Sequence, residues 1–373
     1  MRICFICTEI FEWGKFGGFG KATRTLGREL VKNNIEIFAV VPRQKGQKEF
    51  EILDGIKVLS FSKSHPFSAK KLLVKCNADI YHSEEPSFTS YLAIKELPKK
   101  NHLITSRDPR NIKDWALEFL YPSSNALQVV SNFIFENNIF VSKSVRKAAR
   151  VFYTAKFLKE KVIRKYHIKN EIDFLPTPIK IPQKEIIKSN SPLVCFIGRI
   201  DRRKRPEIFF KLAKVFPDVK FMVVGKSRSN SFEMFLRKKY SSLKNLEITG
   251  FINQFETDKI FDILEKSWIL INPAKREGLP NVFLEALAYK CAILSSVNPE
   301  NIVENFGYYA KNDNFVSGLI LLLKNNSWRK KGEEGQKYVA ENYELGKAVK
   351  QHINIYNSFM NVDRQEDIEI SPS

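Results

Sequence analysis

The sequence predicts an α/β protein made of two Rossmann-like domains, each with a parallel sheet covered by helices. Short apolar runs alternate with helix-like segments along most of the chain, a pattern typical of parallel sheets. The chain has 373 residues, which is more than one domain usually holds. A segment with three prolines, F-L-P-T-P-I-K-I-P at 174–182, divides the chain near its middle. Proline cannot continue a helix or lie centrally in a sheet, so we expect a linker there.

The first domain, 1–178, opens with an apolar run at 2–7, a glycine-containing loop and a helix expected at 22–32. Strand, glycine loop and helix form a layout that can hold phosphate groups. The spacing G-K-F-G-G-F-G-K matches neither the dinucleotide fingerprint nor a Walker loop, so this motif is weak by itself. Further strands are expected in the first domain at 35–41, 56–61, 80–82, 102–105 and 150–153.

Two of these strands end in polar clusters, Y-H-S-E-E-P at 81–86 and T-S-R-D-P-R at 105–110. Ligands of open parallel sheets bind beyond the carboxyl ends of the strands, so both clusters are candidates for a ligand cleft. They contribute His82, Arg107 and Asp108 as possible contacts to an acceptor or a sugar. A single histidine is more often structural, and that alternative stays open for His82.

The second domain, 183–345, has strands expected at 193–197, 220–224, 246–249, 268–271 and 292–295. The first of them is followed by G-R-I-D-R-R-K-R-P-E, which begins at Gly198 and runs into a helix at Pro206. The guanidinium of Arg199 and the ammonium of Lys204 at a helix start suit a diphosphate. A basic loop without further signals would more often be solvated surface. The strand at 220–224 also ends in a glycine, Gly225.

The most informative functional motif in the sequence is R-E-G-L-P-N-V-F-L-E-A-L-A at 276–288. It places Glu277 on a loop, follows it with an elbow of Gly278, Leu279 and Pro280, and starts a helix near Asn281 that carries Glu285. An unpaired carboxylate inside such an apolar helix would be costly to bury. Glu285 is therefore either a core acid paired with a lysine or a contact to a ligand.

The string E-G-x-P-x-x-x-x-E-A-x-A resembles the Glu-x7-Glu element of retaining glycosyltransferases of family 4, and G-R-x-x-x-x-K fits the same family. The resemblance implies the GT-B fold, an enzyme of class EC 2.4 and a nucleoside-diphosphate sugar as donor. It implies a role in the biosynthesis of cell-surface polysaccharides or glycolipids, with a glycan or lipid-linked acceptor. It also implies a crossover helix at 346–361, and the polar tail 362–373 is expected to be disordered.

The resemblance assigns roles to particular residues. Arg199, Lys204 and Glu277 would be catalytic, with Glu277 near the sugar hydroxyls and Glu285 on the nucleotide ribose. The further donor contacts would be Gly17, Gly18, Gly198, Gly225, Gly278, Leu279, Pro280 and Asn281. The sequence departs from the family twice: Arg107 stands where many members carry a histidine, and V-N-P-E-N-I-V-E replaces a glycine-rich turn after Ser296. No Asp-x-Asp motif occurs, so no metal cofactor is expected.

The formal net charge is +20, and much of the excess lies between Lys143 and Lys169. Such a segment is either a solvated face or a surface for a polyanion. An anionic membrane that holds a lipid-linked acceptor is one predicted partner. A nucleic-acid-binding protein is a competing hypothesis, although no helix-turn-helix or zinc motif supports it. A nucleotide-sugar epimerase of the same fold is a second alternative.

The sequence also suggests a compartment. No stretch of about 18 apolar residues appears, and the start of the chain lacks the layout of a signal peptide. Its five cysteines are an odd number in ordinary surroundings, which fits reduced thiols. We therefore expect a cytoplasmic protein that is peripheral to the inner face of a membrane.

Overall fold

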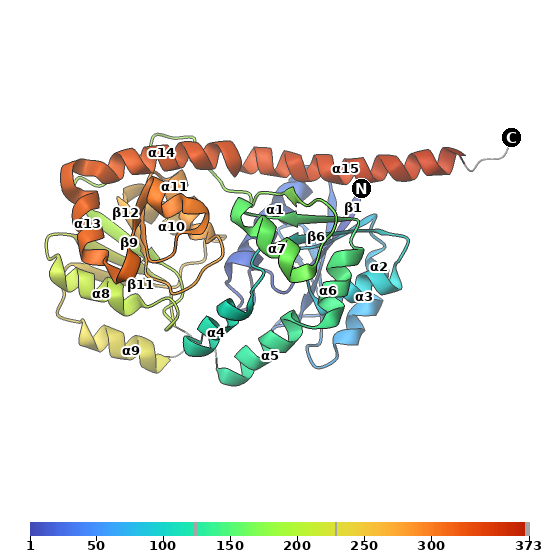
Figure 1. Cartoon of the computed structure of the whole chain (residues 1–373), viewed down its shortest axis with the longest axis horizontal. Helices are drawn as coiled ribbons and strands as arrows, with labels where there is room; N and C mark the ends of the chain where they lie inside the picture. Colours follow the sequence, from blue (N-terminus) through green and yellow to red (C-terminus); the bar gives the residue numbers. More distant parts are fainter. Residues whose placement is uncertain (123–124, 228–229, 370–373) are drawn as a thin grey trace. The chain divides into compact units, whose positions relative to one another are not determined.

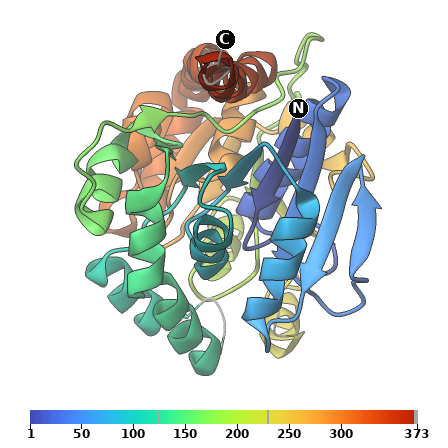
Figure 2. The same ribbon diagram turned by 90° about the vertical axis from the view of Figure 1, so that its right-hand side faces the viewer.

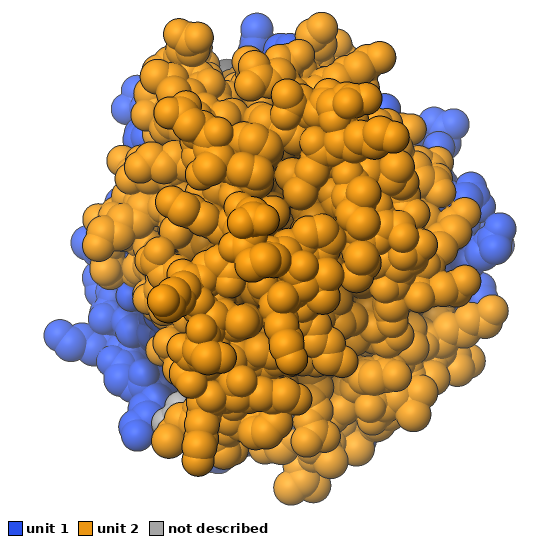
Figure 3. All heavy atoms as spheres, turned by 90° about the vertical axis from the view of Figure 1, so that its left-hand side faces the viewer, with its two compact units in different colours: residues 1–109, 131–178, 345–373 blue, residues 110–130, 179–344 orange. Residues whose placement is uncertain are grey.

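The computed structural model describes residues 1–122, 125–227 and 230–369 of the chain. They divide into two compact units, which Figure 3 colours separately. Unit 1 comprises Met1–Pro109, Ser131–Pro178 and Leu345–Ser373, and unit 2 comprises Arg110–Val130 and Ile179–Glu344. The segment Arg110–Val130 thus groups with unit 2, although both of its chain neighbours belong to unit 1.

Unit 1 contains an eight-stranded sheet with the order β3-β4-β2-β1-β5-β6-β7-β8. All neighbouring strands are parallel except the hairpin of β3 and β4, which lies at one edge in Figure 2. The strands are β1 Arg2–Ile6, β2 Glu36–Pro42, β3 Phe50–Leu53, β4 Ile56–Phe61, β5 Ile80–Ser83, β6 Asn101–Ser106, β7 Arg150–Tyr153 and β8 Asp173–Phe174.

The sequence did not indicate β3 or β8. The hairpin of β3 and β4 turns at Asp54 and Gly55, which both have positive φ angles, 52° and 84°. Such a two-residue turn matches the twist of antiparallel strands. Because β3 has four residues and β8 has two, both are too short to show a pattern of their own.

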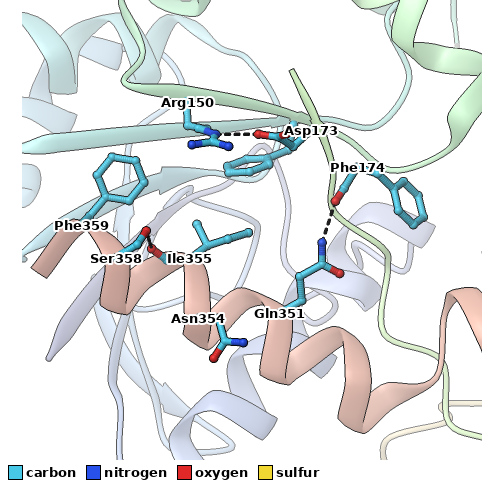
Figure 4. Close-up of a pocket in the computed structure, with 9 residues that line it drawn as sticks. Arg150, Asp173, Phe174, Gln351, Asn354, Ile355, Ser358 and Phe359 are labelled. Carbon is cyan, nitrogen blue, oxygen red and sulfur yellow. Dashed lines mark hydrogen bonds and ion pairs between the residues drawn. The ribbon is translucent and has the colours of Figure 1, made fainter. Parts of the chain in front are cut away.

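The helices of unit 1 cover this sheet. They are α1 Gly18–Lys32, α2 Ala69–Cys76, α3 Phe88–Glu96, α6 Ile139–Lys147, α7 Lys159–Tyr166 and α15 Leu345–Glu369, and α5 Ala126–Glu136 spans the boundary between the two units. The core includes Phe5, Leu26 and Ile37 together with Tyr356 of α15. In Figure 4, Gln351 of α15 donates a hydrogen bond of 2.8 Å to the carbonyl of Phe174. Helix α15 therefore belongs to the packing of unit 1.

Unit 2 has a six-stranded, fully parallel sheet with the order β11-β10-β9-β12-β13-β14. The strands are β9 Leu193–Ile197, β10 Lys220–Val224, β11 Leu246–Gly250, β12 Ile269–Asn272, β13 Ala292–Ser295 and β14 Gly307–Tyr309. The helices, several of them labelled in Figure 1, are α4 Ile112–Leu120, α8 Pro206–Val215, α9 Asn230–Lys239, α10 Lys259–Lys266, α11 Asn281–Ala288, α12 Ile302–Phe306, α13 Phe315–Leu323 and α14 Ser327–Asn342.

The predicted class of fold, two parallel α/β sheets with long helices at the end of the chain, is confirmed. Helices α14 and α15 are separated at Tyr343, whose carbonyl accepts a hydrogen bond from the N–H of Ile179. The tail expected to be disordered falls partly within α15 and partly, at 370–373, outside the described residues. Among the residues that the structure describes, no helix combines the length and apolar character needed to cross a membrane.

Candidate active site

The predicted site residues of unit 2 lie where the order in which strands are added to its sheet reverses. From β9 the chain passes to β10 and β11 on one side, and β12 then begins the series on the other side of β9. Such a switch point between neighbouring parallel strands leaves a crevice at their carboxyl ends, where ligands bind. The loop after β9 carries Arg199 and Lys204, and the loop after β12 carries Glu277. The topology thus brings the two predicted motifs together.

Lys204 and Glu277 form an ion pair in which the side chains are 15% and 11% exposed. Asn272 at the end of β12 donates to the same Glu277 oxygen at 3.4 Å. Burial alone would raise the pKa of the Glu277 carboxyl, but Lys204 and Arg203 outweigh it and hold that pKa below its ordinary value. Glu277 is therefore an anion at neutral pH, and it keeps the Lys204 ammonium at the crevice.

Arg199 lies on the same loop, with its Nε 3.4 Å from Oδ2 of Asp201. Asp201 also shapes the loop, because its Oδ1 accepts a hydrogen bond of 3.0 Å from the backbone N–H of Lys204. One acidic residue thereby organises both predicted cations. The sequence did not single out Asp201.

The glycines that end β9 and β10 are in backbone contact. Gly225 has a φ of +141°, and a Cβ atom at this position would lie 1.9 Å from the carbonyl oxygen of Gly198. Only glycine fits there without a backbone shift. The structure thus supplies a packing reason for Gly225.

Helix α11 begins at Asn281, as predicted, after the half-buried elbow of Gly278, Leu279 and Pro280. Its N-cap is Pro280, which makes no side-chain cap. Glu285 follows Asn281 by four residues and therefore lies on the same side of the helix, one turn further on. The side chain of Glu285 is among the buried residues of α11, with 8% exposure.

Unit 1 has a corresponding switch point between β1 and β5. Gly17 is the N-cap of α1, and Gly18 is its first residue. The Glu9 carboxylate accepts a hydrogen bond of 3.2 Å from the N–H of Gly20, and a Cβ atom on Gly17 would lie 2.0 Å from the same Glu9 oxygen. A carboxylate of the chain itself thus stabilises the positive end of the α1 dipole.

His82 lies in the interior of unit 1. Its Nδ1 is 2.8 Å from the Tyr356 hydroxyl and its Nε2 is 2.8 Å from Oγ1 of Thr105. Burial, only partly opposed by Glu84, lowers the pKa of His82 to about 4. His82 is therefore neutral at neutral pH, and in this structure its contacts tie strands β5 and β6 to helix α15.

Arg107 is also an interior residue. Its guanidinium forms an ion pair with Glu84, and it donates to the carbonyl of Glu84 at 3.2 Å and to Thr177 at 3.0 Å. Glu84 is 2% exposed. Asp108, the next residue, is half-buried. Of the three predicted acceptor-side residues, the structure thus places two in a buried polar network.

Sequence reasoning missed several members of this network. Glu84 and Glu85 lie in the polar cluster noted after β5, but nothing in the sequence pairs Glu84 with Arg107. The carboxylate of Glu85 accepts a hydrogen bond of 2.8 Å from the N–H of Arg107. Burial raises the pKa of Glu85 to about 8. The available signal in the sequence was that two consecutive acids follow one expected strand and an arginine follows the next.

Two further arginines of the loop after β9, Arg203 and Arg205, also have structural partners. Arg203 donates to Glu118 of α4 at 2.9 Å. Arg205 donates to the carbonyl of Pro273 at 2.6 Å, to both Asp313 oxygens and to Ser296 at 3.1 Å.

The segment after Ser296, where the sequence departs from the family pattern, forms a turn. Within it, Oδ1 of Asn298 accepts hydrogen bonds from two N–H groups of α12.

Two cavities lie outside the predicted residues. A groove of about 430 Å³ in unit 1 runs along α15, between Arg150, Asp173 and Phe359 (Figure 4). A smaller cavity of about 210 Å³ in unit 2 is lined by Arg205, Lys275 and the segment 309–313. Among the described residues, no group of three or more His, Cys, Asp or Glu side chains could hold a metal ion.

Two family models match the chain. Residues 179–343 match the family described as glycosyl transferases group 1. Residues 2–141 match the starch synthase catalytic domain. The two matches together extend over both halves of the predicted fold.

Curated relatives agree with these matches. The chain is 25% identical over 199 residues to an uncharacterized glycosyltransferase of Haemophilus influenzae, a match that covers 50% of this chain and 55% of the relative. It is 22% identical over 321 residues to an α-1,4-N-acetyl-D-galactosaminyltransferase of Campylobacter jejuni, which covers 79% of each chain. The chain thus spans just over half the length of the first relative.

Solved structures share the fold over nearly the whole chain. Sucrose-phosphate synthase from Thermosynechococcus elongatus superposes with a TM-score of 0.71 and 14% identity, covering 97% of this chain and 99% of the other. HepE from Anabaena, in complex with UDP-glucose, has a TM-score of 0.70 and 11% identity, covering 96% and 100%. The two family matches and this shared fold lead to one conclusion: the chain has the GT-B fold, and its second half, residues 179–343, matches the glycosyl transferases group 1.

Proposed function

We propose that this protein is a retaining glycosyltransferase that moves a sugar from a nucleoside-diphosphate sugar to a glycan or lipid-linked acceptor. The observation that carries the proposal is the Lys204–Glu277 pair at the carboxyl ends of β9 and β12. It is supported by HepE, whose structure contains UDP-glucose, and by the Campylobacter relative, which is named for an undecaprenol-linked glycan.

The proposed chemistry follows from the charge that develops during the reaction. When the bond between sugar and phosphate breaks, negative charge accumulates on the departing diphosphate, and cations fixed against it stabilise the transition state. Arg199 and Lys204 take this role, and Glu277 holds Lys204 and binds sugar hydroxyls. Glu285 contacts the ribose. Backbone groups of Gly198, Gly225 and the elbow Gly278–Asn281 line the donor site.

On unit 1, the residues proposed to contact the donor phosphates are Gly17 and Gly18. Asp108 stays a proposed acceptor contact, because it is half-buried in the loop that follows β6. His82 and Arg107 act through the interior network that shapes this end of the sheet. The two protein cations do the work of a divalent metal, and we propose no metal cofactor.

Steady-state kinetics test the assignment. A thermal-shift screen of UDP-, GDP- and ADP-sugars first identifies the donor, since a ligand of the native state raises its melting temperature. With that donor and EDTA present, Arg199→Ala and Lys204→Ala are each expected to lower turnover by at least about a hundredfold. Glu285→Gln is expected to raise the donor KM instead, because a ribose contact is equal in the ground and transition states.

The exposed neighbour Arg202 supplies the control, and Arg202→Ala should keep near-normal turnover. Near-normal turnover in both Arg199→Ala and Lys204→Ala, or complete loss of wild-type activity with EDTA, would contradict the phosphate-clamp assignment. Conversion of the donor to an epimer without acceptor would instead favour the epimerase.

We also propose that the protein docks on an anionic membrane through unit 1. Five large apolar side chains of α5 and α6 are exposed there: Phe133, Ile134, Phe135, Ile139 and Phe140. The second half of α6 carries three exposed cations, Lys143, Arg146 and Lys147. An apolar surface beside cations fits a bilayer interface with anionic lipids, where each cation contributes about 1 kcal/mol.

Five buried, free cysteines are compatible with the reducing cytoplasm as the proposed compartment.

Vesicle sedimentation at low salt tests the docking. The wild type should pellet with vesicles that contain phosphatidylglycerol and much less with neutral vesicles. Ile134→Asp with Ile139→Asp should release it, whereas Ile187→Asp, at an equally exposed isoleucine of unit 2, should not. Equal recovery with neutral and anionic vesicles would remove the charge argument, and unchanged binding of the double variant would remove the apolar one.

A further inference from the structure

Helix α4 contacts the two loops that carry the Lys204–Glu277 pair. Arg203 Nη1 donates to Glu118 Oε2 at 2.9 Å, and Arg276 Nε donates to Asp114 Oδ1 at 2.9 Å. Arg203 directly precedes Lys204 in the chain, and Arg276 directly precedes Glu277. One helix therefore binds the immediate neighbour of each member of the pair.

The spacing on α4 explains how one helix reaches both loops. Asp114 and Glu118 are four residues apart, so they lie on one face of the helix. The loops themselves are joined by a backbone hydrogen bond of 3.1 Å from Lys275 N–H to the carbonyl of Arg203. The Lys275 ammonium lies 5.8 Å from the centre of the Tyr121 ring, just after α4. Contacts from three positions thus connect this segment to the paired loops.

The burial of these ion pairs makes them significant. The side chains of Glu118 and Arg203 are 2% and 12% exposed, and those of Arg276 and Asp114 are 6% and 15% exposed. Ion pairs at the surface contribute little, but loss of one member of a buried pair leaves a charge without compensation. Asp114 is additionally held in place by the capping box that it forms with Asn111 at the start of α4.

Arg203, the partner of Glu118, is also attracted by the carboxylate of Glu277. Arg203 is close enough to Glu277 for that carboxylate to raise the pKa of Arg203 against the effect of burial, and Glu118 acts in the same direction. Without the Glu118 charge, the anion left to attract Arg203 most strongly is Glu277, which now holds Lys204. Glu118 therefore gives Arg203 a direct ion-pair partner at 2.9 Å, while Lys204 pairs with Glu277.

We infer that α4 is a positioning element of the donor site, in which Asp114 and Glu118 hold Arg276 and Arg203 and thereby fix the geometry of Glu277 and Lys204. Neither carboxylate touches the substrate in this scheme, so both are positioning residues. The inference rests on the proposed function for its kinetic consequences. Its structural consequence, ordering of the two loops, does not depend on any activity.

Hydrogen–deuterium exchange of the ligand-free protein is the first test. Glu118→Gln and Asp114→Asn are expected to speed exchange at least about threefold in peptides from the loops 199–206 and 273–280. Asp114→Asn is the safer variant for folding, because the asparagine oxygen can still accept the capping hydrogen bond of Asn111. Lys113→Gln, at an exposed position of the same helix, is the matched control and should leave exchange unchanged. Unchanged loop exchange in both carboxylate variants would overturn the inference.

Kinetics are the second test, with turnover divided by the number of nucleotide-binding sites measured by titration. A positioning role predicts a fall in kcat of about tenfold to a hundredfold, because small misplacements of catalytic groups are costly. The double variant Glu118→Gln with Arg203→Gln should recover part of this loss, since the competing cation is gone. A lowered melting temperature with normal kcat per site would show a structural role only and overturn the inference. If the wild type binds no nucleotide, the proposed function fails, while the exchange experiment still decides the role of α4.

Discussion

Replacing Arg107 by methionine is expected to destabilise unit 1 strongly. Glu84 would keep only weaker contacts, such as the Thr23 hydroxyl at 3.5 Å and His82 Nδ1 at 3.8 Å from its two oxygens. Removing one partner of a buried pair typically costs about 3 to 5 kcal/mol. The Thr177 hydroxyl would also lose its hydrogen bond from Arg107, which adds about 1 kcal/mol. We therefore expect a loss of about 4 to 6 kcal/mol at neutral pH.

The cost should depend on pH in a defined direction. In the wild type, burial raises the pKa of Glu84, but Arg107 holds it below its ordinary value. Without Arg107 the buried carboxyl can avoid its penalty by taking up a proton, and each pH unit is worth about 1.4 kcal/mol. The loss of stability should thus be smaller at pH 5 than at pH 8.

Urea denaturation, followed by hydrogen exchange in peptides from β5 and β6, measures unit 1 separately. Arg164→Met, at an exposed arginine of α7 with 82% side-chain exposure, is the matched control and should change stability by less than about 0.5 kcal/mol. Glu84→Gln combined with Arg107→Met should recover part of the loss. Wild-type stability of Arg107→Met together with a large fall in acceptor kcat/KM would refute this reasoning and restore Arg107 as a direct acceptor contact.

Three further predictions concern single positions. Gly225→Ala should lower the melting temperature clearly in a thermal scan, because its Cβ would lie 1.9 Å from the Gly198 oxygen; an unchanged value would contradict this. Glu85 has a pKa of about 8 in the folded state and near 4.5 otherwise, so the folded carboxyl holds a proton that the unfolded one loses, and stability should fall as pH rises between these values. Glu85→Gln should flatten that slope in urea titrations, and an equal slope would contradict the assignment. Arg205→Gln should cost at least about 2 kcal/mol in urea denaturation, whereas Arg202→Gln at an exposed position should not, and equal effects would contradict the buried role of Arg205.

Local sequence patterns determined most of the fold. Apolar runs match β4, β7, β9, β10 and β13 at both ends, because a buried parallel strand needs consecutive apolar residues whatever surrounds it. The start of α11 at Asn281 followed from the proline elbow before it. Very short edge strands such as β8 and β14 remained invisible, since pairing with a neighbour rather than their own residues defines them.

The motifs of the candidate site were equally local, because Arg199, Lys204, Glu277 and Glu285 lie in two short strings. Their meeting was not local. Lys204 and Glu277 are 73 positions apart, and only the order of β9 and β12 in the sheet brings them into contact. The family resemblance predicted that both motifs serve one ligand, and the tertiary structure places Lys204 and Glu277 in contact.

Only the tertiary structure showed which of the remaining polar residues are buried and with which partners they interact. His82 and Arg107 resemble cleft residues in the sequence, yet their partners Tyr356 and Thr177 come from distant segments and bury them. In the sequence, the carboxylates of α4 resemble ordinary surface acids. In the structure they form buried ion pairs with Arg203 and Arg276. The energy of a charged side chain depends on its burial and on its partners, and both are set by residues far away along the chain.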